Sequence, residues 1–310
     1  MMTIDDLKAK RIGVLLGGMS SERDVSLKSG AAIAKALREA AYTVVEIDVQ
    51  RDLPQRLLAE KIDVAFIALH GRYGEDGSVQ GLLESMFIPY TGSGVLASSV
   101  GMEKVFTKQV FVARGIPTPK HVVFETVDQA LEEKLPFDLP VVVKPSREGS
   151  SVGVSLAKDA TQYRDAVKQA GKLAGLIMVE QFIKGREVQG AVLDDEALGV
   201  IEIVPAREFY DYEAKYGAGS GTQYIFPARL DPELYDRVNQ TCLAAHRALG
   251  CSGATRSDAI VTEKGELYLL EVNTLPGMTA SSLLPKIAAG KGLSFTQLCE
   301  RLLQGASLKA

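Results

Sequence analysis

The chain has 310 residues, of which 46 % are hydrophobic and 24 % charged. This length indicates two or three domains rather than one ordinary core, and the composition is that of a soluble globular protein. The mild net charge of −4 argues against nucleic acid or an anionic membrane as a partner. No apolar run approaches the roughly 20 residues that cross a bilayer. The three cysteines form no C-x-x-C pair, so we expect free thiols and a cytoplasmic protein.

The first hundred residues alternate short apolar runs with helical stretches, as in a parallel β-sheet. We expect strands at 11–16, 42–49 and 61–69, and helices at about 24–40 and 79–87. His70 follows the third strand, at the sheet edge where ligands bind, and is therefore a candidate site residue. Glu22 follows the first strand at the same edge. Alternatively, its charge only complements the amino end of a helix.

A second unit begins near residue 103 and has the mixed order of an α+β domain. We expect strands at 120–124, 141–144, 152–157 and 176–181, and helices at 103–113, 128–135 and 161–170. The second strand ends at Lys144, and a serine- and glycine-rich loop follows it to Gly153. The backbone N–H groups and hydroxyls of such a loop can hold a phosphate, with Lys144 as a point charge. A plain turn is the alternative, although such turns are usually shorter.

The third unit begins near residue 186. We expect strands at 188–193, 198–204, 254–261 and 266–272, a helix at 232–249 and a helical end. Residues 205–228 show no sustained periodicity, although they include Tyr210, Tyr212 and Tyr216. A loop of this length inside a compact domain is usually functional or disordered, and its aromatic residues argue against disorder. We therefore predict a functional segment.

The last predicted hairpin carries the most specific cluster of polar residues. Arg256 and Asp258 lie two residues apart on one strand and so share a face, and Glu271 and Asn273 do the same on the next strand. Pairing the strands would bring three oxygen ligands and one guanidinium onto one surface. Such ligands suit Mg²⁺ or Mn²⁺, and the guanidinium suits a phosphate or an oxyanion. An ordinary hairpin with a polar solvent face is the alternative.

Two glutamates near the end of the 176–181 strand are weaker candidates. Glu180 and Glu187 can accept hydrogen bonds from ribose hydroxyls, but taken alone they are better explained as solvated carboxylates. Neither the P-loop pattern nor the complete G-x-G-x-x-G dinucleotide pattern occurs in the chain. Any nucleotide site must therefore be built differently.

Six blocks along the chain resemble the ATP-grasp superfamily and, within it, the D-alanine–D-alanine ligase family. They are LLGGMSSERDVSLKSG, ALHGRYGEDGSVQGLLE, PYTGSG, KPSREGSSVGVS, FYDYEAKY and LLEVNTLPGMTASSL. The resemblance implies a fold of three domains that is α/β in one part and α+β in the others. These would be a Rossmann-like parallel-sheet domain (1–103), a central ATP-grasp subdomain (104–185) and a C-terminal ATP-grasp subdomain (186–310). Segment 205–228 would be a lid.

The resemblance also implies the ligands and the residues that hold them. ATP would be bound by Lys104, Lys144, Ser151, Glu180, Gln181, Phe182, Ile183 and Glu187. Two Mg²⁺ or Mn²⁺ ions would be bound by Asp258, Glu271 and Asn273. The first D-alanine would contact Glu22, and the carboxylate of the second would contact Lys215 and Ser282. The implied product is D-alanyl-D-alanine for peptidoglycan synthesis, made by a homodimer.

At the reacting centre, the resemblance assigns the oxyanion donors to Arg256 and the N–H of Gly277. His70 and the network of Tyr216, Ser150 and Glu22 are alternative sources of the base that deprotonates the reacting amine. The sequence does not choose between them. Two rival functions are another ATP-grasp ligase, such as one that makes D-alanyl-D-lactate, and a non-catalytic nucleotide-binding protein. The second would be expected to lack some of the charged site residues, all of which are present.

Tyr216 is expected to set the choice of acceptor substrate. The resemblance implies this, since family members that make D-alanyl-D-lactate have phenylalanine at the matching position. The Tyr216→Phe variant should therefore use amine acceptors less well relative to hydroxy acids. Rates of dipeptide and depsipeptide formation, measured side by side, test this. Unchanged rates for both products would mean that Tyr216 does not set acceptor choice.

Overall fold

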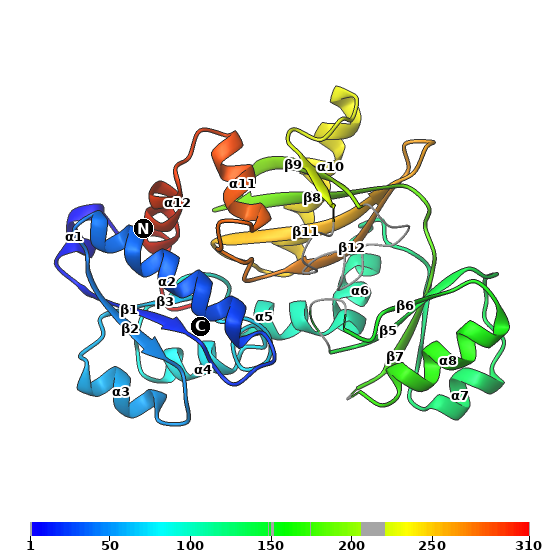
Figure 1. The fold of residues 1–310 in the computed structure, drawn as a ribbon, viewed down its shortest axis with the longest axis horizontal. Coiled ribbons are helices and arrows are strands. Elements are labelled where there is room, and N and C mark those ends of the chain that lie inside the picture. Colours follow the sequence, from blue (N-terminus) through cyan, green and yellow to red (C-terminus); the bar gives the residue numbers. More distant parts are fainter. Residues whose placement is uncertain (1, 148, 150–151, 174, 206–220, 310) are drawn as a thin grey trace.

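The computed structural model describes residues 2–147, 149, 152–173, 175–205 and 221–309. Within these residues the strands form three sheets, which lie side by side along the long axis of the molecule (Figure 1). None of the described helices is both long enough and apolar enough to cross a membrane.

The first sheet is parallel and has the order β2-β1-β3, as the βαβ pattern predicted. Its strands are β1 (Arg11–Leu16), β2 (Thr43–Asp48) and β3 (Val64–Ile67), and the helices around it are α1 (Ile4–Lys8), α2 (Arg23–Glu39), α3 (Leu53–Ala59), α4 (Ser78–Ser85) and α5 (Val95–Met102). Apolar side chains of β1 enter two separate core clusters, so both faces of the sheet are covered. This explains why the strand is a continuous apolar run rather than an alternating one.

The second sheet is antiparallel, with the order β4-β7-β5-β6. It consists of β4 (His121–Phe124), β5 (Val141–Pro145), β6 (Ser155–Ala157) and β7 (Ile177–Gln181), and it packs against α7 (Val127–Glu132) and α8 (Ala160–Ala170). The strand predicted from residue 152 begins only at Ser155. Gly153 has a φ of +71°, a left-handed conformation that does not continue a strand.

The third sheet has the order β10-β9-β8-β11-β12. Its strands are β8 (Arg186–Leu193), β9 (Glu196–Val204), β10 (Gln223–Ile225), β11 (Ala254–Val261) and β12 (Leu267–Asn273), and α10 (Pro232–Ala248) covers one face. The prediction of an irregular segment from 205 to 228 is wrong for Gln223–Ile225, which pairs with β9 and forms one edge of the sheet. Three residues of strand are too short to show a periodic pattern in the sequence.

One break between helices also escaped the sequence. The helix predicted from residue 103 is preceded by α5, and the two are separated at Glu103, whose backbone is extended. α6 (Lys104–Ala113) then leads from the first unit to the second. The break matters because it turns α6, with Lys104 at its first position, toward the space between the second and third sheets (Figure 1).

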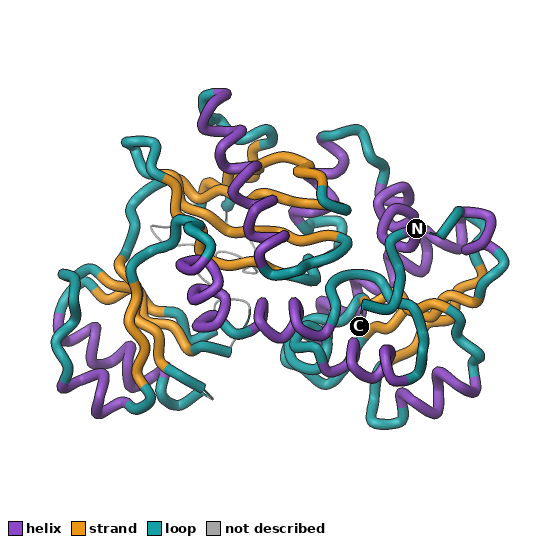
Figure 2. The backbone as a smooth tube through the Cα atoms, turned by 180° about the vertical axis from the view of Figure 1, so that it is seen from behind, coloured by secondary structure: helices purple, strands orange, loops and turns teal. Residues whose placement is uncertain are grey.

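The end of the chain returns to its beginning. α11 (Leu283–Gly290) and α12 (Phe295–Gln304) follow the last strand, and α12 packs beside α2 (Figures 1 and 2). Leu302 and Leu303 share one apolar cluster with Ile33 and Leu37 of α2. This core fixes the parallel sheet against the β8–β12 sheet and brings the ends of β1 and β3 near the loop after β12.

Candidate active site

A cavity of about 510 Å³ lies between the β4–β7 sheet and the β8–β12 sheet. Its lining includes the apolar side chains of Val142 from one sheet and of Ile260 and Leu270 from the other, so the cavity suits a flat aromatic ring. The structure gathers here all the predicted nucleotide contacts that it describes, namely Lys104, Lys144, Glu180, Gln181, Phe182, Ile183 and Glu187. Asp258 and Glu271 line the same cavity. Nucleotide and metal candidates from three parts of the chain thus share one space.

Three charged side chains form a buried chain at one end of this cavity. Glu180 receives Lys108 on one carboxylate oxygen at 2.8 Å and Lys144 on the other at 2.5 Å. The Glu180 side chain is 2 % exposed, so the interpretation of a solvated carboxylate is wrong. Burial alone would raise its pKa, but Lys108 and Lys144 outweigh burial and lower the pKa to about 2. Glu180 is therefore a carboxylate at any physiological pH.

The two lysines differ because only one of them faces the cavity. Burial lowers the pKa of Lys108 to about 8, against the opposing effect of Glu180. Burial also acts on Lys144, but the negative charges of Glu180, Glu271 and Asp258 outweigh it and raise the pKa of Lys144. Lys144 keeps 11 % of its side chain exposed and lines the cavity, where it stays an ammonium.

The antiparallel pairing of β11 with β12 places the predicted metal ligands together. Arg256 lies opposite Asn273, and Asp258 lies opposite Glu271. The four side chains therefore share one face in two adjacent cross-strand pairs, as the i, i+2 spacing predicted. Among the described residues, no group of three or more histidine, cysteine, aspartate or glutamate side chains could hold a metal. The donor set is therefore two carboxylates and an amide, hard oxygen ligands that fit Mg²⁺ or Mn²⁺.

A β-bulge at Leu270 produces this geometry. The register shifts between Asp258 and Ala259, so Glu271 faces Asp258 while Leu269 faces Ala259. Leu269 and Val272 point into the core beside α10, whereas Leu270 and Glu271 both line the cavity. The extra residue lets two successive side chains face the ligand space, one apolar and one acidic.

Basic side chains lie beside both carboxylates. Arg256 Nε is 3.1 Å from Asp258 Oδ1, and Lys104 Nζ is 3.9 Å from Glu271 Oε2. Arg256 and Lys104 are both mostly buried, with 18 % and 12 % of their side chains exposed. Because α6 delivers Lys104 from one side and β11 delivers Arg256 from the other, cations flank the carboxylate pair. This arrangement can bind a polyanion that brings cations of its own.

Glu22 lies in a second cleft of about 810 Å³, at the carboxyl end of the parallel sheet. A Cβ atom added to Gly71 would lie 2.7 Å from Glu22 Oε2, and one added to Gly149 would lie 3.4 Å from it. Glu22 therefore sits against the loop after β3 on one side and the serine- and glycine-rich loop after β5 on the other. Glycine at position 71 gives the carboxylate room.

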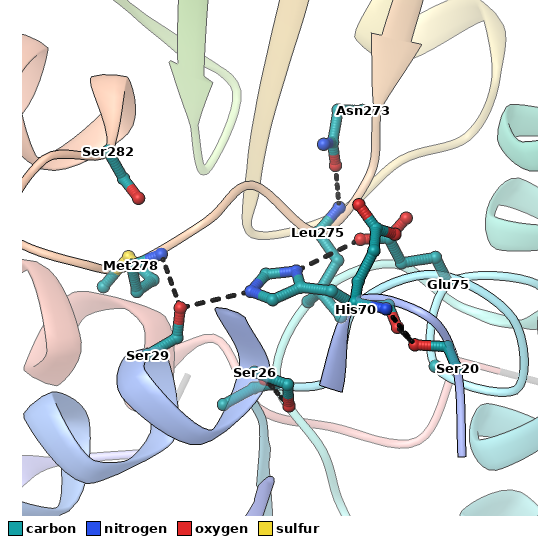
Figure 3. Close-up of polar contacts among 12 residues, drawn as sticks. Ser20, Ser26, Ser29, His70, Glu75, Asn273, Leu275, Met278 and Ser282 are labelled. Atoms are coloured by element: carbon teal, nitrogen blue, oxygen red, sulfur yellow. Dashed lines mark hydrogen bonds and ion pairs between the residues drawn. The ribbon is translucent and has the colours of Figure 1, made fainter. Parts of the chain in front are cut away.

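His70 belongs to a hydrogen-bonded chain between the parallel sheet and the loop after β12 (Figure 3). Its Nδ1 is 3.2 Å from Glu75 Oε1, and its Nε2 is 3.2 Å from Ser29 Oγ. Ser29 Oγ in turn accepts the backbone N–H of Met278 at 3.3 Å. With the imidazole proton on Nδ1, every contact joins one donor to one acceptor. Both ring nitrogens of His70 thus already have partners.

Gly277 and Ser282 lie together in the loop after β12, which the hydrogen-bonded chain through His70 and Ser29 reaches at Met278. A Cβ atom on Gly277 would lie 2.9 Å from Ser282 Oγ, so only glycine fits without a shift. Ser282 Oγ accepts the N–H of Thr279 at 3.0 Å, and Ser282 begins α11 as its N-cap. The predicted residues Ser150, Ser151, Lys215 and Tyr216 lie outside the described residues.

Comparisons with known proteins agree with this geometry. Two family models match the chain: the D-ala D-ala ligase N-terminus over residues 53–93 and the D-ala D-ala ligase C-terminus over residues 110–304. The chain is 58 % identical over 308 residues to a D-alanine--D-alanine ligase of Geotalea uraniireducens, which covers 99 % of both chains. It is 59 % identical over 312 residues to that of Geobacter sulfurreducens, which covers 99 % of this chain and 98 % of the relative. The chain belongs to the D-alanine–D-alanine ligase family.

Solved structures of this family also share the fold. The D-alanine--D-alanine ligase of Bacillus anthracis complexed with ATP superposes with a TM-score of 0.82 at 36 % identity. A second structure of the Bacillus anthracis enzyme gives 0.83 at 39 % identity. Both matches cover 96 % of this chain and 97 % of the other. The predicted mixed α/β and α+β fold of the ATP-grasp type is thereby confirmed.

Three residues of this family member join the site without having been predicted from the sequence. Lys108 contacts Glu180, Ser29 contacts His70 and Met278, and Glu75 contacts His70. Lys108 follows Lys104 by one helical turn, a spacing that puts both on one face of α6. That spacing was the available signal. Ser29 and Glu75 gave a weaker signal, because they lie within segments that resemble the ligase family but follow no distinguishing pattern there.

The Ser29→Ala variant should lose about 1–3 kcal/mol of unfolding free energy, because it leaves buried polar groups of His70 and Met278 unpaired. The matched control is Ser85→Ala, whose hydroxyl bonds Gly81 O within an exposed helical turn. The control should change stability by less than about 0.5 kcal/mol. Urea unfolding of both variants measures the difference. Equal stabilities would show that the chain through Ser29 is not a significant link between the two units.

Proposed function

We propose that this chain joins two D-alanine molecules with ATP, by way of D-alanyl phosphate. A carboxylate oxygen of the first D-alanine attacks the γ-phosphorus, and ADP leaves. The amine nitrogen of the second then attacks the carbonyl carbon, the bond from that carbon to the phosphate oxygen breaks, and phosphate leaves. The observation that carries the proposal is the single cavity where Lys104, Lys144, Asp258 and Glu271 converge.

The phosphate end of this reaction needs positive charge that is already in place, because the charge moves but does not vanish during transfer. Lys144 and Lys104 supply it from β5 and α6. We propose that the adenine lies in the apolar part of the cavity near Phe182 and Ile183, with Glu187 near the ribose. Mg²⁺ or Mn²⁺, held by Asp258, Glu271 and Asn273, would neutralise phosphate charge when bound.

The amino-acid end lies where the parallel sheet meets the loop after β12. We propose that Glu22 holds the ammonium group of the first D-alanine, and that Ser282 and Lys215 hold the carboxylate of the second. Arg256 and the N–H of Gly277 would stabilise the oxyanion of the tetrahedral intermediate. Contact of the Gly277–Ser282 loop with α2, through Met278 and Ser29, supports this placement.

The base that deprotonates the reacting amine is either His70 or the network of Glu22, Ser150 and Tyr216. His70 already contacts Glu75 and Ser29 with its two ring nitrogens. We propose that His70 positions Ser29, and through it the Gly277 loop, and that the network of Glu22, Ser150 and Tyr216 receives the proton. Glu22 lies beside the loop that contains Ser150, which supports this assignment.

We further propose the setting in which the reaction runs. The division into domains at 1–103, 104–185 and 186–310 follows the three sheets, except that α12 packs back onto α2. Closure of the 205–228 segment would keep water from the acyl phosphate. The enzyme would be a cytoplasmic homodimer, and its dipeptide would enter peptidoglycan synthesis.

The central test is ADP formation with D-alanine, L-alanine or D-lactate as the only acceptor and donor, with and without Mg²⁺. We expect ADP, phosphate and D-alanyl-D-alanine in equal amounts with D-alanine and Mg²⁺, and little turnover in the other mixtures. The product is identified by mass. A lack of D-alanine-dependent ADP formation overturns the proposal, and formation of D-alanyl-D-lactate when D-lactate is added to the D-alanine mixture favours the rival ligase.

The metal assignment has its own test. The Glu271→Gln variant should need about tenfold more Mg²⁺ for half-maximal binding of ADP, since an amide is a weaker ligand than a carboxylate. The control is Glu263→Gln, an exposed carboxylate in the turn of the same hairpin. Calorimetric titration with ADP at several Mg²⁺ concentrations separates them. Identical Mg²⁺ dependence in both variants would remove Glu271 from the metal site.

A further inference from the structure

Lys108 is buried in the protein but lies beside the candidate nucleotide cavity. Its side chain is 1 % exposed, and it is absent from the residues that line the cavity. A buried ammonium costs several kcal/mol unless it is paired and hydrogen-bonded. A lysine in such a place therefore needs an explanation, and direct contact with a ligand cannot provide it.

The ammonium of Lys108 has three partners inside the protein, two hydrogen-bond acceptors and the carboxylate of an ion pair. Nζ lies 2.6 Å from Thr118 Oγ1, 2.8 Å from Glu180 Oε1 and 3.4 Å from the carbonyl of Leu269. These partners surround an ammonium that is almost completely buried. Lys108 can thus act on a ligand only through another residue, and Glu180 is the charged one among its partners.

Glu180 passes the effect on to Lys144, the lysine that faces the cavity. One oxygen of Glu180 contacts Lys108, and the other contacts Lys144. Two ammonium groups and one carboxylate leave the trio with one net positive charge. Without Lys108, Glu180 would cancel the charge of Lys144 at 2.5 Å. The trio would then have no net charge to offer a phosphate.

The same contacts join the two walls of the cavity. Thr118 Oγ1 donates to the Leu269 carbonyl at 2.8 Å, and Leu269 lies on β12 two residues before Glu271. Glu180 lies on β7 in the other sheet. Lys108 therefore has two separable actions. One is mechanical, through Thr118 and Leu269, and the other is electrostatic, through Glu180.

We propose that Lys108 is a positioning residue whose buried ammonium neutralises Glu180, so that Lys144 keeps its positive charge for the phosphates of a bound nucleotide. This inference rests on the nucleotide binding proposed above. It explains why the protein tolerates the desolvation cost of burying the Lys108 ammonium. The charge that the ligand meets on Lys144 is maintained by a residue that the ligand does not contact. Although burial lowers the pKa of Lys108 to about 8, the side chain remains mostly protonated at neutral pH.

The experiment compares a charged ligand with a neutral one that fills the same cavity. Calorimetric titrations with ADP and with adenosine, both in excess Mg²⁺ at neutral pH, are made on wild type and on Lys108→Met. Removing one net charge near a polyanion should weaken ADP binding about tenfold while adenosine binding changes less than about twofold. Equal weakening of both ligands overturns the proposal, because a mechanical defect acts on both.

Two further variants separate the electrostatic action from the mechanical one. Lys108→Met combined with Glu180→Gln leaves Lys144 as the single charge of the trio, so the ratio of ADP to adenosine affinity should return to within about threefold of wild type. Thr118→Val keeps all three charges but removes one contact of Lys108. It should leave that ratio unchanged.

The double variant also serves if Lys108→Met does not fold, because it contains no unpaired buried carboxylate. An affinity ratio in the double variant that stays about tenfold below wild type overturns the proposal. Failure of the proposed function looks different, since wild type itself would then bind neither ADP nor adenosine.

Discussion

The pairing of β11 with β12 is the constraint on which the rest of the site depends. One face of this pair belongs to the core beside α10, and the other closes the cavity. The bulge at Leu270 lets the strand satisfy both, since it puts an apolar side chain and Glu271 side by side in the cavity and returns Val272 to the core. A one-residue slip of this register would bury the carboxylates and expose the core face. The packing that stabilises the fold therefore also fixes the candidate metal ligands.

Charge is arranged around this pair in layers. Lys104 and Arg256 flank the carboxylates at the cavity, and behind them Lys108 and Glu180 are almost completely buried. Buried ion pairs rarely improve stability over apolar residues of the same shape. Their presence beside a cavity lined with phosphate-binding candidates is better explained by function, because charges fixed by the protein need no reorganisation when a polyanion binds.

The amino-acid end of the site depends on a different contact. α2 and α12 share an apolar cluster that holds the parallel sheet against the third sheet, and Ser29 adds a buried polar link to the loop after β12. Through that link, residues from the start of the chain meet residues from its end. Substrate positioning and the stability of the interface between the two units are consequently coupled, so changes at Ser29 should affect both.

The sequence by itself determined most of the strand and helix order, although it missed β10 and the break between α5 and α6. It also determined the glycine- and serine-rich loop and the polar pairs at Arg256, Asp258, Glu271 and Asn273, because periodicity and i, i+2 spacing are local properties. Its resemblance to the ligase family determined the identity of most candidate contacts. Only the tertiary structure decided that Glu180 is a buried bridge and that both ring nitrogens of His70 are occupied. It also decided the role of Lys108, which lies on an ordinary helix and 72 positions from Glu180 in the chain. Burial and long-range pairing depend on how the sheets pack, and no local pattern encodes that packing.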